Sequence, residues 1–93
     1  MKDKSPAGLP VFLVDDDQSV LHSTAAVLHS AGVAHVELID DSRELLPALE
    51  QQPASTVLLD LFMPHVTGNE LLPKIIQLYP ELPVIVMLSL IHI

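Results

Sequence analysis

Four short apolar runs, separated by segments with helical periodicity, limit most strongly what this chain can fold into. The runs are rich in β-branched residues, which is typical of strands. The segments between them repeat apolar residues at the spacing of amphipathic helices. Strands that alternate with helices form right-handed crossovers and a mostly parallel sheet covered on both faces, so the sequence predicts an α/β fold. The expected strands are 11–14, 36–39, 56–59 and 84–87.

Capping signals predict where the three helices begin and end. The apolar positions of the first helix start at Val20, and Gly32 supplies its C-terminal stop. The second helix, ending near residue 51, and the third, ending near residue 79, each open with the spacing of a capping box: Asp41 with Glu44, and Thr67 with Glu70. Pro47 and Pro73 lie beyond the first turn of these helices, where proline costs roughly 3 kcal/mol unless the helix kinks or begins later.

The composition indicates one folded domain and excludes several functions. The chain has 93 residues, 49% of them hydrophobic, which is enough for a single buried core. Its formal net charge of -8 repels phosphate backbones and anionic lipids, so we expect no direct contact with nucleic acid or membrane. It contains no cysteine, and no apolar run approaches the roughly 20 residues of a membrane helix. A cytoplasmic location is therefore expected.

Aspartate residues end two of the predicted strands. Asp15, Asp16 and Asp17 follow the first strand, and Asp60 ends the third. Because ligands bind outside the carboxyl ends of parallel strands, we expect three or four of these carboxylates to converge in one crevice if the two strands are neighbours. Crowded carboxylates favour a bound cation, and an all-oxygen ligand set favours Mg²⁺. For each aspartate taken singly, the alternative is a helix cap or a turn residue.

The residues after Asp60 also suit a binding loop. Met63 and Pro64 lead the chain out of the strand into a rigid loop. Gly68, just before the third helix, permits a backbone conformation or a close approach that other residues resist. These features support a shared site over isolated caps and turns.

Three motifs resemble the receiver domain of two-component response regulators. They are VFLVDD at 11–16, LLDLFMP at 58–64 with Gly68 following, and LPVIVM at 82–87. The resemblance runs over residues 10–87. It implies a doubly wound, flavodoxin-like parallel sheet with strand order 2-1-3-4 and helices on both faces, in which the fifth strand of the family is missing. It also implies a signalling domain rather than an enzyme.

The same resemblance implies roles for particular residues. Asp60 would be the phosphoacceptor, taking a phosphoryl group from a histidine kinase or a phosphotransfer protein. Asp15, Asp16, Asp60 and the backbone carbonyl of Phe62 would hold Mg²⁺. The added charge would then act as a switch read by an output domain of the parent chain.

Several positions depart from the family pattern. Leu88 stands where the family has a switch hydroxyl, Ser89 comes one step late, and nothing matches the lysine that ends the family's fifth strand. The segment 88–93, LSLIHI, is identical to one reading frame of a common sequencing adapter. We therefore hypothesise a non-family, artefactual tail after a partial receiver domain at 10–87; the alternative is a natural divergent C-terminus. Residues 1–9 are expected to form a flexible leader.

Two other functions share parts of this pattern with a phosphoacceptor. A haloacid-dehalogenase-like phosphatase also places a nucleophilic aspartate after a strand, but it needs a second acid two positions on, where this chain has Phe62. A pseudo-receiver would keep the fold and dock a partner without phosphorylation. The presence of Asp15, Asp16 and Asp60 argues against that alternative for the parent protein. For the chain as given, the pseudo-receiver stays an open alternative, because without the family's lysine and switch hydroxyl phosphoryl transfer should be slow.

Overall fold

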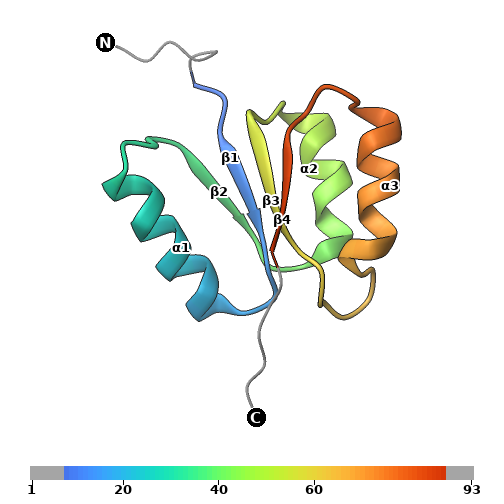
Figure 1. The fold of residues 1–93 in the computed structure, drawn as a ribbon, viewed down its shortest axis with the longest axis horizontal. Helices are drawn as coiled ribbons and strands as arrows, with labels where there is room; N and C mark the ends of the chain where they lie inside the picture. Colours follow the sequence, from blue (N-terminus) through green and yellow to red (C-terminus); the bar gives the residue numbers. More distant parts are fainter. Residues whose placement is uncertain (1–7, 88–93) are drawn as a thin grey trace.

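The computed structural model describes residues 8–87, which alternate strands and helices along the chain (Figure 1). The strands are β1 (Val11–Val14), β2 (Val36–Ile39), β3 (Thr56–Asp60) and β4 (Val84–Met87). The helices are α1 (Gln18–Ser30), the 3₁₀ turn η1 (Ser42–Glu44), α2 (Leu45–Gln51) and α3 (Gly68–Leu78). The predicted leader at 1–9 lies mostly, and the tail at 88–93 entirely, outside the described residues.

The four described strands form one parallel sheet in the order β2-β1-β3-β4, which confirms the predicted topology. The register aligns Val14 of β1 with Ile39 of β2 and with Leu59 of β3. The strands therefore end nearly level at their carboxyl ends, and the loops that follow β1 and β3 leave the sheet side by side.

Helices cover both faces of this sheet, with α1 on one face and α2 and α3 on the other (Figure 1). Successive side chains of β1 point to opposite faces of the sheet, so Phe12 and Val14 belong to one core cluster and Leu13 to the other. The larger cluster contains Phe12, Val14, Ile39, Leu45, Leu49, Val57, Leu59, Met63, Leu71 and Ile75. The smaller cluster contains Leu13, Leu21 and Ala25. Burial on both faces explains why β1 is an unbroken apolar run.

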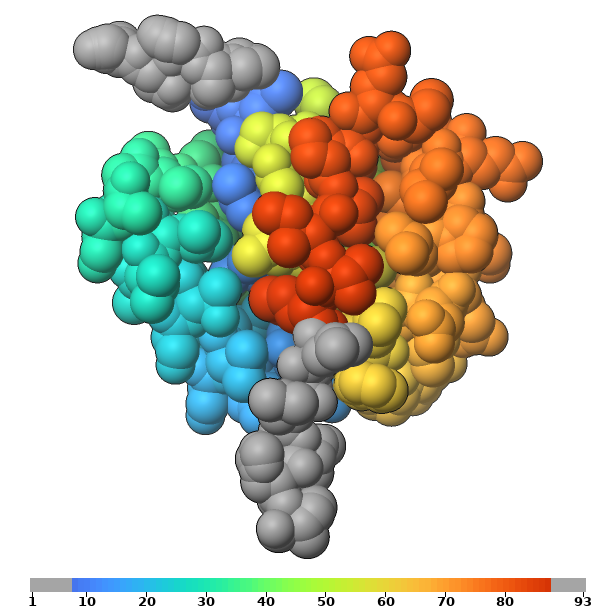
Figure 2. Space-filling view, viewed as in Figure 1, coloured from blue at the N-terminus to red at the C-terminus, as the bar shows by residue number. Residues whose placement is uncertain are grey.

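β4 forms one edge of the described sheet and is only partly covered. Figure 2 shows it at the surface between α1 and α3. Ile85 is 53% exposed, and its register partner is Leu58, which packs against the smaller core cluster beside α1. The α1 side of the described sheet is thus well covered over β1 and open over β4.

The first and third helices begin and end as the capping signals predict. α1 ends at Ser30, and Gly32 follows with a positive φ of 100°. At the start of α3, the Thr67 side chain accepts a hydrogen bond from the Glu70 backbone N–H, and Glu70 accepts one from the Thr67 N–H. This reciprocal pair is the predicted capping box, and α3 runs through Pro73. In residues 8–87, no helix has the length and apolar character needed to cross a membrane.

The prediction that Asp41 and Glu44 form a capping box is wrong. The Asp41 side chain accepts a hydrogen bond from the Arg43 N–H, and η1 precedes the α-helix. The short Asp side chain satisfies the nearer N–H first, which tightens the turn. α2 consequently begins at Leu45, so Pro47 falls within the first helical turn, where no backbone N–H partner is needed.

Candidate functional site

Three carboxylates meet at the carboxyl end of the sheet. Asp15 and Asp16 directly follow β1, and Asp60 is the last residue of the neighbouring strand β3. One ligand oxygen from each lies within 4.8 Å of the others. Asp15 and Asp60 are buried, at 3% and 0% exposure, and Asp16 is exposed. The cluster is therefore open to solvent on one side and enclosed by the fold on the other.

Three of the four aspartates form the cluster, and Asp17 is the one that does not join it. Its Oδ1 accepts hydrogen bonds from the N–H groups of Ser19 (2.8 Å) and Val20 (3.3 Å). These donors have no partner within the helix, and a capping Asp satisfies them. The alternative of a helix cap is thus correct for Asp17.

The cluster disfavours the ionised form of Asp15. Burial, together with the neighbouring carboxylates of Asp60 and Asp16, raises the pKa of Asp15 from 3.8 to about 6. The Asp17 N–H, which donates to Asp15 Oδ1 at 3.0 Å, opposes this shift. The folded state therefore holds Asp15 in a position that disfavours its ionised form, and such shifted carboxyl groups are typical of functional sites.

The loop between β3 and α3 is tied to Asp60. The Phe62 N–H donates a hydrogen bond to Asp60 Oδ1 at 3.2 Å. The side chain of Phe62 is 57% exposed, whereas Met63, the next residue, is 5% exposed and belongs to the larger core cluster. The bond to Asp60 and the burial of Met63 therefore hold the start of this loop beside the carboxylates.

Gly68 closes the same loop by a close backbone approach. A Cβ atom at this position would lie 2.6 Å from the Leu61 Cα and 2.7 Å from the Asp60 carbonyl oxygen. The Gly68 N–H donates to the Leu61 carbonyl at 3.2 Å. The first turn of α3 therefore rests directly on the backbone that carries Asp60, as the sequence predicts for a glycine here.

We expect Gly68→Ala to lower the free energy of unfolding by about 1–2 kcal/mol, because the added methyl meets backbone atoms that cannot rotate away. Urea titration of both proteins measures the change. Asn69→Ala, at the exposed next position of the same helix turn, is the matched control and should stay within about 0.5 kcal/mol of the parent. Equal unfolding midpoints for Gly68→Ala and its parent would contradict the close approach.

The donor set of the cluster fits a hard divalent cation such as Mg²⁺. Three carboxylate oxygens supply the ligand type that Mg²⁺ prefers, and a cation would favour the ionised form of Asp15, which burial and the neighbouring carboxylates disfavour. Within residues 8–87, Asp15, Asp16 and Asp60 make up the one cluster of three or more ligating side chains. His22 and His29 of α1 are exposed and belong to no such cluster among these residues.

The sequence as a whole matches the family profile described as the response regulator receiver domain, over residues 11–90. The chain belongs to this family. The receiver domain accounts for the parallel sheet and for the position of the acidic cluster at its carboxyl edge.

Relatives and solved structures agree with this assignment. The chain is 34% identical to response regulator RR06 of Streptococcus pneumoniae, over 86% of this chain and 36% of that protein. It is 36% identical to the DNA-binding transcriptional regulator NtrC of Salmonella typhimurium, over 83% of this chain and 16% of that protein. A CheY-like receiver domain protein from Methanospirillum hungatei superimposes with a TM-score of 0.80 at 29% identity, over 91% of this chain and 67% of that one. The chain thus matches about a third or less of the length of these two curated relatives.

Two features of the site carry no clear signal in the sequence. Ser42, between β2 and α2, is 2% exposed and bonds to the β3–α3 loop. His65 in that loop has a left-handed backbone with φ of 65°, which is uncommon for a residue other than glycine. Leu88 and Ser89, which concern the switch hydroxyl, lie outside the described residues.

Proposed function

We propose that this receiver domain accepts a phosphoryl group on Asp60 from the phosphohistidine of a histidine kinase or a phosphotransfer protein. Asp15, Asp16, Asp60 and the Phe62 carbonyl would hold Mg²⁺. The observation that carries the proposal is the meeting of three carboxylates within 4.8 Å at the end of adjacent strands, with Asp60 fully buried. Membership of the receiver family supports the same reaction.

In the proposed transfer, a carboxylate oxygen of Asp60 attacks phosphorus and forms a P–O bond as the P–N bond to the donor imidazole breaks. The electron pair of the broken bond returns to the imidazole nitrogen. The Phe62 N–H, bonded to Asp60 Oδ1, orients the carboxylate for this attack. When bound, Mg²⁺ would neutralise charge on the transferring phosphoryl oxygens. Water later cleaves the acyl phosphate, which releases phosphate and restores Asp60.

The biological role proposed for this transfer is a signalling switch rather than turnover of a substrate. A phosphorylated Asp60 would add charge and acceptor oxygens at the sheet edge and change the surface around it. The relative NtrC is named a DNA-binding transcriptional regulator, which supports an output domain in the parent protein. With its net charge of -8, the receiver segment would leave nucleic acid to that output domain. We place this relay in the cytoplasm.

A small acyl phosphate, used as the phosphodonor, tests the proposal on the 93-residue chain. We expect the intact mass to rise by one phosphoryl group in the presence of Mg²⁺ and to stay unchanged when EDTA removes the metal. Circular dichroism on the same samples verifies that the chain is folded. A folded chain that gains no phosphoryl group with Mg²⁺ would contradict the proposal and would favour a pseudo-receiver that docks a partner without phosphate.

A further inference from the structure

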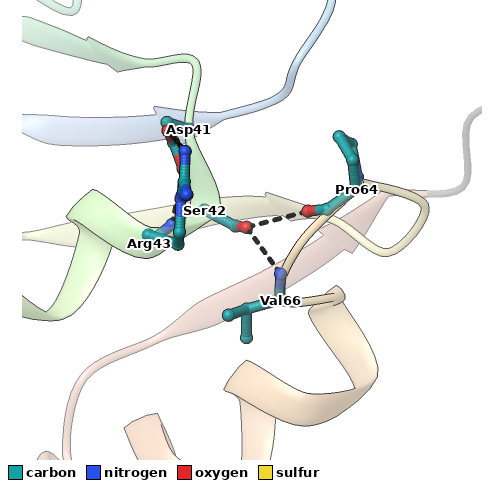
Figure 3. Close-up of polar contacts among 5 residues, drawn as sticks. All are labelled: Asp41, Ser42, Arg43, Pro64 and Val66. Carbon is teal, nitrogen blue, oxygen red and sulfur yellow. Dashed lines mark hydrogen bonds and ion pairs between the residues drawn. The ribbon is translucent and has the colours of Figure 1, made fainter.

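One buried hydroxyl links the segment after β2 to the loop after β3. The Ser42 Oγ donates to the Pro64 carbonyl and accepts from the Val66 N–H, each at 3.2 Å (Figure 3). Ser42 is 2% exposed, so water does not readily replace these bonds. A single side chain therefore satisfies two backbone groups that lie 22 and 24 residues further along the chain.

The two bonded groups bracket the left-handed residue of the loop. His65 lies between Pro64 and Val66 and has a φ of 65°. For residues with a side chain this conformation costs roughly 1–2 kcal/mol, so the surroundings must hold it in place. The Ser42 hydroxyl is hydrogen-bonded to the carbonyl before His65 and to the N–H after it. Bonds at these two groups stabilise the left-handed backbone of His65.

The segment that carries Ser42 is itself braced. The guanidinium of Arg43 contacts Asp41 at 2.7 Å, and its hydrogen bonds hold the pKa of the Asp41 carboxyl well below its usual range. On the other side, the Gln18 side chain of α1 donates to Asp40 at 2.6 Å. Ser42 thus sits in a segment fixed to the start of α1, which follows the Asp15 and Asp16 pair.

The rest of the β3–α3 loop is held near its two ends. Phe62 bonds to Asp60 at the start, and the Gly68 N–H bonds to Leu61 at the end. The backbone between Pro64 and Val66 is held by Ser42. The first of these bonded groups, the Pro64 carbonyl, lies two residues after the Phe62 carbonyl.

We propose that Ser42 is a positioning residue for the metal site, which sets the backbone that carries the Phe62 carbonyl through its two bonds to the β3–α3 loop. This role rests on the proposed function, since it assumes that the carbonyl is a Mg²⁺ ligand. It assigns the β2–α2 segment a part in metal binding that its distance in sequence from Asp60 does not suggest.

The experiment compares Mg²⁺ dissociation constants of the 93-residue chain and its variants, each far below its melting temperature. Ser42→Ala removes both bonds, and we expect it to weaken Mg²⁺ binding about tenfold, as loss of a group that orients a metal ligand does. Ser42→Cys has a side chain of similar size that forms only weak hydrogen bonds, so it should fold like the parent. Its Mg²⁺ dissociation constant should lie between those of the parent and Ser42→Ala. Hydrogen exchange at the Val66 amide should speed up in both variants, without any metal.

Ser55→Ala is the matched control at the opposite end of the sheet. The Ser55 Oγ also donates to a proline carbonyl, that of Pro10, at 3.1 Å. This variant should lose similar stability but leave the Mg²⁺ dissociation constant within twofold of the parent, about 0.4 kcal/mol. A merely structural role for Ser42 would make the two serine variants alike.

The outcomes separate this role from the proposed function. If the parent binds Mg²⁺ and both Ser42→Ala and Ser42→Cys have the same dissociation constant as the parent, only the positioning role is overturned. If Ser42→Ala does not fold, Ser42→Cys decides the question in the same way. A folded parent without any Mg²⁺ response would overturn the proposed function, and the positioning role with it.

Discussion

Asp60→Asn is expected to abolish Mg²⁺-dependent binding of beryllofluoride, a mimic of the phosphoryl group. The mimic needs a carboxylate oxygen to complete its coordination, and the amide of Asn supplies neither that oxygen nor its charge. The fold should survive, because Asn has almost the same volume and its Oδ1 can still accept the Phe62 N–H bond. The effect should therefore be a loss of chemistry at an intact site.

Fluorescence or NMR titration with beryllofluoride and Mg²⁺ measures this loss. Asp17→Asn is the matched control, because it makes the same change in the same acidic run at a residue that caps α1. Asn is as good a cap as Asp, so this variant should bind the mimic like the parent. Equal binding by Asp60→Asn and the parent would rule out Asp60 as the residue that holds the phosphoryl group.

Asp15→Asn is expected to stabilise the metal-free domain, by an amount that grows with pH. The pKa of Asp15 is about 6 in the folded state, against 3.8 ordinarily, so the folded state binds the proton more tightly than the unfolded state does. The Asp15 contribution is therefore favourable at low pH and is lost as the pH rises from about 4 to about 6. Asn resembles the protonated acid at every pH. A shift of about two pKa units corresponds to a gain of about 3 kcal/mol at pH 7.5.

Urea titrations of Asp15→Asn and the parent, both in EDTA, measure this difference. At about pH 3.5 the two proteins should differ little, because Asp15 is then protonated in the folded state and mostly protonated in the unfolded state. Asp17→Asn again serves as control and should gain no stability at pH 7.5, since the Asp17 carboxylate caps a helix. If the free energies of unfolding of Asp15→Asn and the parent differ by the same amount at both pH values, the raised pKa of Asp15 is contradicted.

The fold follows from the sequence because local and long-range signals agree. Apolar, β-branched runs predict all four strands, and the parallel arrangement places Asp15, Asp16 and Asp60 at one edge. The strand order itself came from a family resemblance and not from periodicity. The missed start of α2 shows the limit of spacing rules, since Asp41 can bond to the N–H two or three residues on and the sequence pattern is the same.

The site is harder to predict from the sequence where side chains bond to backbone groups of other residues. Asp17 follows Asp15 and Asp16 in the sequence, yet its side chain bonds to N–H groups at the start of α1. Ser42 is a small polar residue at the start of η1, and its two partners lie in the β3–α3 loop. Neither the left-handed backbone of His65 nor its bracketing bonds has a local sequence pattern, because tertiary contacts enforce them.

The assignment of Asp60 as phosphoacceptor is tested most directly by locating the phosphoryl group on the chain. After treatment with an acyl phosphate and Mg²⁺, borohydride reduces an aspartyl phosphate to homoserine, which peptide mass spectrometry places at one position. We expect homoserine at position 60, the buried carboxylate at the end of β3. Homoserine at position 15, 16 or 17, or a folded chain with no homoserine at all, would contradict the assignment.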